Sequence, residues 1–163
     1  MVEPLTNADL CSARSVSAGE PLAGSAPQAQ VWVLIEQPGP WGRDAIVDSH
    51  LDPELGQQLR AWAEPYPIRL GTIRRLGRHA DQHVVGDEHA ILIARCTPDG
   101  AWLWQTTNCS PELVCQLDQR TLLEANSPPA TLPAGHQVDR VLLVCTNSKR
   151  DRCCALLGRG LAA

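Results

Sequence analysis

The segment of residues 141–155 constrains this 163-residue chain more than any other. It begins with four apolar residues, passes through Cys145 into a polar loop with four charged residues, and reaches two adjacent cysteines. The pattern predicts a strand over 138–145 and a helix over 152–161, joined by this loop. Helix N-termini favour negative charge, and the thiolate is the form of cysteine that binds metal ions and attacks electrophiles. The junction therefore predicts metal binding or thiol chemistry.

The rest of the chain shows the alternation of strands and helices that is typical of an α/β fold. Apolar runs predict strands over residues 31–36, 68–76, 89–96 and 101–107. Residues 98–100, Pro-Asp-Gly, are expected to form the turn of a hairpin. A helix should begin at Pro53, because Asp52 suits the capping position and proline suits the first helical position. A short helix should open at 110–112, and residues 1–30 should be loop with one helical turn.

Composition excludes several classes of protein. Hydrophobic residues make up 44% of the chain, charged residues 20%, and the formal net charge is −4, which is an ordinary globular balance. We expect no membrane-spanning helix, because no apolar run approaches about 18 residues. A sequence pI near 5.7 argues against general binding of nucleic acid. Seven cysteines without a signal-peptide pattern favour reduced thiols and a cytoplasmic location.

Two motifs, in the same order, resemble those of a known family. The first comprises Cys11-Ser12, the segment Gly-Glu-Pro-Leu-Ala-Gly-Ser-Ala at 19–26, and Trp-Val-Leu-Ile-Glu-Gln-Pro-Gly-Pro-Trp-Gly at 32–42. The second runs from Cys145 to Cys154 and reads Cys-Thr-Asn-Ser-Lys-Arg-Asp-Arg-Cys-Cys. Together they span nearly the whole chain, and they resemble the sucrase/ferredoxin-like family of thioredoxin-like ferredoxins.

The resemblance implies a thioredoxin-like layered sheet with helices and a 2Fe–2S cluster held by two cysteines and two histidines. It makes Cys145 and Cys154 the thiolate ligands, in a protein that passes single electrons to an unidentified redox partner protein. The histidines would come from a His-x-Gly-Gly-His-like motif, which this sequence lacks. Many relatives also carry histidine at the position of Asn147. Ligation is therefore expected to be incomplete, and the chain alone should not hold a stable cluster.

The resemblance also implies a division of the chain. Residues 1–125 would be the N-terminal α/β domain of the family and 126–137 a linker rich in proline and glycine. Residues 138–163 would be the start of the thioredoxin-like ferredoxin domain, which is expected to be truncated.

The residues leave a second chemistry open at the same loop. Cys145 at the end of a strand, with Arg150 five positions later, resembles the anion-binding loop of sulfurtransferases, in which a thiolate is the nucleophile of an enzyme. Against this, Asp151 beside Arg150 would repel an incoming anion, and the loop contains no glycine. We expect the chain not to be an enzyme by itself. A third possibility is that the cysteines form no site.

Several other residues are candidates for a site, and most of them have both a functional and a purely structural interpretation. His79 and His83 are four residues apart, so on a helix they would share a face and could bind a metal ion, while a charged surface loop is the alternative. Cys11 is either a packing residue or part of the site, and Cys153 is either a neighbour of the ligands or half of a vicinal disulfide. The remaining cysteines, Cys96, Cys109 and Cys115, are predicted to be small buried hydrophobes. Trp41 should pack down the turn at 37–42, or belong to a docking surface for a redox partner.

Overall fold

The computed structural model describes residues 10–21, 23, 27–38, 40–74, 89–106, 108–147, 149 and 152–161. The chain divides into two compact units, one made of Gln28–Val141 and the other of Met1–Pro27 together with Leu142–Ala163. His79 and His83 lie outside the described residues, so their predicted roles stay predictions. The division into an N-terminal domain, a linker and a truncated ferredoxin domain also stays a prediction.

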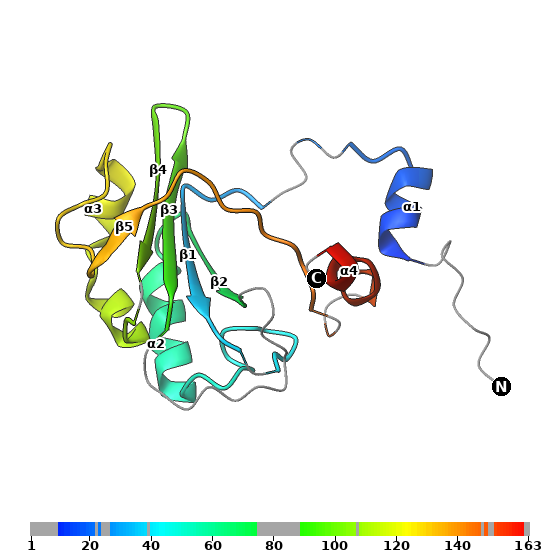
Figure 1. Cartoon of the computed structure of the whole chain (residues 1–163), viewed down its shortest axis with the longest axis horizontal. Coiled ribbons are helices and arrows are strands. Elements are labelled where there is room, and N and C mark those ends of the chain that lie inside the picture. The colour runs from blue at the N-terminus through cyan, green and yellow to red at the C-terminus, as the bar shows by residue number, and fades with distance from the viewer. Residues whose placement is uncertain are drawn as a thin grey trace. The chain divides into compact units, whose positions relative to one another are not determined.

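The unit Gln28–Val141 is built on a mixed five-stranded sheet with the order β2-β1-β3-β4-β5 (Figure 1). The strands are β1 (Val31–Glu36), β2 (Ile68–Ile73), β3 (Ile91–Thr97), β4 (Gly100–Thr106) and β5 (Gly135–Gln137). Strands β1 and β2 run parallel, and the other neighbours are antiparallel. The prediction of an α/β fold is confirmed, and so is the hairpin between β3 and β4.

Helix α2 (Pro53–Ala63) connects the two parallel strands and begins where the sequence predicted. Asp52 Oδ1 accepts hydrogen bonds from the backbone N–H of Glu54 and Leu55, and Pro53 occupies the first turn. These bonds satisfy N–H groups that have no partner inside the helix. The buried face of α2 packs with one face of the sheet in a single core (Figure 1). The largest fully buried side chains of this core include Leu59, Ile35, Ile91, Ile93 and Leu122.

Three tryptophan side chains tie the chain after β4 to this core. This part of the chain contains the short helices η2 (Pro111–Gln116) and α3 (Gln119–Glu124) and the strand β5. Each indole N–H donates to a backbone carbonyl: Trp62 to Leu117, Trp102 to Ala125, and Trp104 to Pro133, at 2.9, 2.8 and 3.0 Å. A buried indole combines a large apolar area with one polar group that needs a partner. These bonds therefore fix the path of a segment that contains little regular structure.

The prediction of a strand over residues 138–145 is wrong. The described residues of that range form no strand, and the sheet instead takes β5 from the range expected to be a linker. Gly135 suits this edge, because a Cβ at that position would overlap the carbonyl oxygen of Gln105 on β4. An apolar run becomes a strand only where a neighbouring edge supplies backbone partners. The run at 141–144 is exposed instead, with Leu142 88% accessible.

The second unit contains helix α1 (Cys11–Ser17) and a helical segment over 152–161. The latter has a wide turn, η3 (Cys154–Gly158), followed by α4 (Arg159–Leu161). The predicted helix over 152–161 is confirmed, whereas α1 is longer than the single helical turn expected near the N-terminus. Within the described residues, no helix has the length and apolar character needed to cross a membrane.

Candidate functional site

The structure brings together the two cysteines that the sequence singled out as ligands. The Cys154 thiol lies close enough to the Cys145 thiol and to its chain neighbour Cys153 for both to act on its pKa. Burial, followed by the two neighbouring thiols, raises the pKa of Cys154 to about 12. Cys154 is therefore a protonated thiol at neutral pH when no metal ion is bound, and ligation there requires release of a proton.

Close backbone packing accounts for this pairing. Gly158 is buried, and an added Cβ would overlap the carbonyl oxygen of Cys145 and lie 3.5 Å from the Val144 side chain. Any larger residue would push the helical segment away from the chain that carries Cys145. Glycine at this position thus allows the helix that carries Cys154 to approach the backbone at Cys145 closely.

The loop between the two cysteines begins with a turn formed by Asn147. Its side chain is buried, 8% accessible, and Oδ1 accepts a hydrogen bond from the backbone N–H of Lys149 at 3.0 Å. An asparagine that binds the backbone two residues on imitates a backbone turn and fixes the direction of the loop. The neighbours that mattered to the sulfurtransferase reading, Arg150 and Asp151, lie outside the described residues.

A second pair of cysteines adjoins the first, and sequence reasoning left its role open. The Cys11 and Cys153 sulfurs are 2.8 Å apart, although 142 positions separate them in the chain. Cys11 is exposed on α1, and Cys153 is buried. The resemblance marked Cys11 as the start of a motif, but no spacing rule in a sequence signals such a distant contact.

The four thiols form a row from Cys11 to Cys153, Cys154 and Cys145: the Cys11 and Cys153 sulfurs are 2.8 Å apart, and the Cys145 and Cys153 thiols both raise the pKa of Cys154. Among the described residues, no three His, Cys, Asp or Glu side chains are grouped so as to hold a metal ion. The donor set therefore fits half of a four-ligand cluster site. Its chemistry is that of paired thiols, which bind soft metal ions or exchange with disulfides.

The other three cysteines belong to the unit Gln28–Val141. Burial raises the pKa of the Cys109 and Cys115 thiols, and the charge of Glu112 adds to the rise in both. The prediction that both are packing residues agrees with Cys109, which is buried, and Cys115 is half-buried and packs against the core. Cys96, also expected to be buried, is exposed. The prediction for Cys96 was wrong because side chains alternate between the two faces of a strand. Cys96 follows the buried Arg95 near the end of β3 and therefore lies on the opposite, exposed face.

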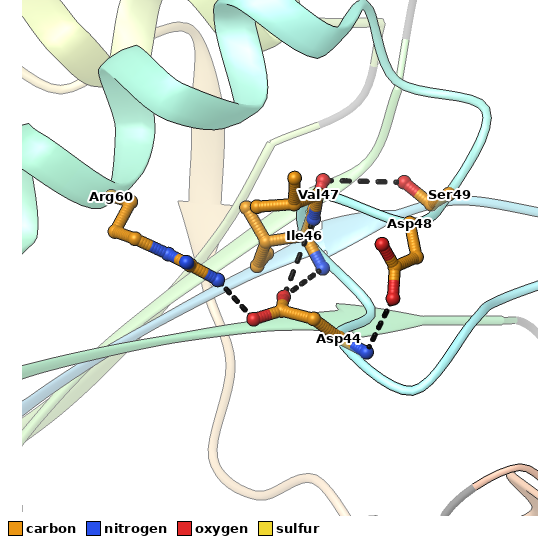
Figure 2. Close-up of polar contacts among 6 residues, drawn as sticks. All are labelled: Asp44, Ile46, Val47, Asp48, Ser49 and Arg60. Atoms are coloured by element: carbon orange, nitrogen blue, oxygen red, sulfur yellow. Dashed lines mark hydrogen bonds and ion pairs between the residues drawn. The ribbon is translucent and has the colours of Figure 1, made fainter.

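The loop after β1 forms a separate polar network, which Figure 2 shows. Asp44 Oδ1 accepts from the backbone N–H groups of Ile46 and Val47 at 3.1 and 3.3 Å, and Asp44 also pairs with Arg60 of α2. Burial raises the pKa of Asp44, but these N–H groups and the guanidinium outweigh it, and the pKa lies below its usual value. The network holds the loop to α2.

Trp41 packs down the turn that the sequence identified. Its indole N–H donates to the carbonyl of Gln37 at 2.7 Å, and the Arg74 guanidinium lies 3.8 Å from the centre of its ring. A cation over an aromatic face is a stabilising contact. The packing role of Trp41 is thus visible in the structure, and its role in docking a partner stays a prediction.

No family model, curated protein or solved structure matches this chain. The resemblance to the sucrase/ferredoxin-like family accordingly stays a prediction, and function must be argued from the cysteines themselves.

Proposed function

We propose that this chain belongs to a one-electron carrier of the sucrase/ferredoxin-like type, in which Cys145 and Cys154 are thiolate ligands of a 2Fe–2S cluster. The supporting observation is the close packing of the helical segment that carries Cys154 against the backbone at Cys145, which brings the two thiols near enough for Cys145 to raise the pKa of Cys154. The same proposal includes a thioredoxin-like arrangement around the cluster, a redox partner protein and a location in the cytoplasm.

The chemistry of the donor set supports the assignment. Iron–sulfur clusters are bound by cysteine thiolates, and histidine replaces two of the four cysteines in centres of higher potential. The cluster would supply reversible uptake of one electron. Lys149 and Arg152 are exposed and lie between the two cysteines in the sequence, so their charge would offset that of the thiolates. The Cys154 thiol must lose its proton on ligation.

Two thiols fill half of the ligand positions of such a cluster. In the family that the sequence resembles, the other half would be filled by imidazoles. The experiment is therefore anaerobic reconstitution of the full chain with ferrous iron and sulfide, with and without added imidazole, followed by desalting and assay of iron and sulfide. We expect little iron without imidazole and about two iron atoms per chain with it.

Matched variants identify the ligands. Cys145→Ser and Cys154→Ser should each abolish the imidazole-dependent iron, whereas Cys96→Ser, which removes an exposed cysteine of the other unit, should leave it unchanged. Iron uptake that survives both of the first two substitutions would refute the assignment. Iron held without imidazole and lost on changing both His79 and His83 to alanine would make those histidines ligands.

The same variants test the nucleophile alternative. We expect no transfer of sulfur from thiosulfate to cyanide by the wild-type chain. Turnover that is lost in Cys145→Ser but kept in Cys154→Ser would instead establish Cys145 as the nucleophile of a sulfurtransferase-like enzyme.

A further inference from the structure

We propose that Cys11 and Cys153 form a redox-active dithiol that exchanges with small disulfides and closes to an intramolecular disulfide. This activity is separate from ligation by Cys145 and Cys154. The observation that carries it is the 2.8 Å contact between the two sulfurs, which are 142 positions apart in the chain.

The separation favours bond formation over shared ligation of a metal ion. Two thiolates on one tetrahedral metal ion, with bonds of about 2.3 Å, lie about 3.8 Å apart. The sulfurs of a disulfide are about 2.05 Å apart. At 2.8 Å, the Cys11 and Cys153 sulfurs lie nearer to the disulfide separation than to that of two metal-bound thiolates. Their contact thus suits an internal dithiol.

The two thiols differ in access, which assigns them different steps. Cys11 is exposed at the start of α1, whereas Cys153 is 8% accessible. A disulfide from solution therefore meets Cys11 first, and Cys153 is placed to attack only after Cys11 has reacted. Exchange needs access to the attacked sulfur as well as a nucleophilic thiolate.

The reaction is a two-step exchange. The Cys11 thiolate attacks one sulfur of a disulfide RSSR, the S–S bond breaks, and one RS⁻ leaves as a mixed disulfide forms on Cys11. Cys153 then loses its proton to water and attacks the Cys11 sulfur, which releases the second RS⁻. The two cysteines lose two electrons, RSSR gains them, and two RSH result after protonation. The substrate class is a small disulfide such as glutathione disulfide, and transient disulfides of this kind are the sort found in reducing compartments.

The test uses the full wild-type chain, incubated with glutathione disulfide, quenched with acid, alkylated and digested with trypsin. Cleavage after Arg14 and Arg152 places Cys11 and Cys153 in different peptides. We expect the loss of two thiols per chain and a cross-linked pair containing Cys11 and Cys153. Since the second peptide also contains Cys154, the digest is repeated on Cys154→Ser, in which the cross-link should persist.

Two further variants test the order of the steps. In Cys153→Ser, a glutathione adduct should accumulate on Cys11, because no thiol resolves it. In Cys11→Ser, adduct formation at Cys153 should be at least tenfold slower than the wild-type loss of thiols, because Cys153 is buried. A cross-link from Cys11 to Cys145 or Cys154, a Cys153–Cys154 disulfide, or an unresolved adduct on wild-type Cys11 would each overturn the proposal. The wild-type measurement stands even if a variant fails to fold.

Discussion

At the scale of single residues, the cysteine row depends on a glycine. Gly158→Ala should destabilise the unit that carries the thiols by about 1–3 kcal/mol, because the new methyl group overlaps the Cys145 carbonyl. The measurable result is faster labelling of the buried Cys153 by a maleimide. Gly160→Ala is the matched control in the same helical segment, since nothing lies within 4 Å of a Cβ there. Equal labelling rates in the two variants would contradict the packing described above.

Asp44 provides a prediction of pH dependence. Its pKa is lowered in the folded chain, so it stabilises the fold at pH values above the unfolded pKa of about 3.9, and this contribution is lost as the pH falls through the lower folded value. Asp44→Asn should therefore cost less than about 1 kcal/mol at pH 7, because the pair with Arg60 is half exposed. The difference between the variant and wild type should shrink below about pH 4 in urea unfolding curves. A difference in unfolding free energy that grows as the pH falls would show that the pKa of Asp44 is raised, not lowered, in the folded chain.

Some of these residue roles were accessible from sequence. The resemblance paired Cys145 with Cys154, which stays a prediction, and the helix that carries Cys154 has formed as the sequence predicted. The partner of Cys153 was not accessible, because its contact with Cys11 joins the two ends of the chain and no local pattern encodes such a contact. Cys96 was misjudged because membership of an apolar strand does not fix which face a terminal residue presents.

At the scale of elements, the indole bonds make β5 dependent on Trp104. Trp104→Phe keeps an aromatic ring but removes the donor to the Pro133 carbonyl, two residues before β5 begins. Pro133 and Trp104 are half-buried, so the loss of this hydrogen bond should cost about 0.5–1.5 kcal/mol. Hydrogen exchange of the backbone amides in β5 should become faster, with β1 unchanged. Unchanged exchange in β5 would mean that the strand is held by its ladder with β4 alone.

The exposed apolar run at 141–144 predicts where the chain is cut. Thermolysin cleaves before large apolar residues, and Leu142 is 88% accessible in a segment without strand or helix. Limited digestion should therefore cut within 141–144 first and release a stable fragment that contains the sheet. A first cut within β3 or β4, identified by mass spectrometry, would contradict this order.

The success of element prediction followed local chemistry. Helix α2 was predictable to its first residue because Asp52 and Pro53 act within one turn, and the β3–β4 hairpin because Pro-Asp-Gly specifies a turn. The strand expected at 138–145 failed because apolar composition says nothing about a free neighbouring edge. Strand β5 was missed because it has three exposed residues and is set by partners elsewhere in the sheet.

At the scale of the whole molecule, the Cys11–Cys153 disulfide would join the two chain segments that make up the unit Met1–Pro27 and Leu142–Ala163. A cross-link between segments so distant in sequence stabilises a fold by restricting the unfolded chain, by about 2–4 kcal/mol in typical cases. After oxidation by glutathione disulfide, amides in α1 and in the helical segment 152–161 should exchange more slowly, while those in β3 stay unchanged. Slower exchange in β3 alone would show that oxidation acts elsewhere.

The central claim is that Cys145 and Cys154 hold a centre that accepts single electrons. The most direct measurement is an anaerobic reductive titration of the chain reconstituted with iron, sulfide and imidazole, with electron paramagnetic resonance of the frozen product. The account predicts uptake of one electron for about every two iron atoms, with a paramagnetic signal that is absent in Cys145→Ser and Cys154→Ser and present in Cys96→Ser. A reducible centre that persists in both Cys145→Ser and Cys154→Ser, or bound iron that accepts no electron, would contradict it.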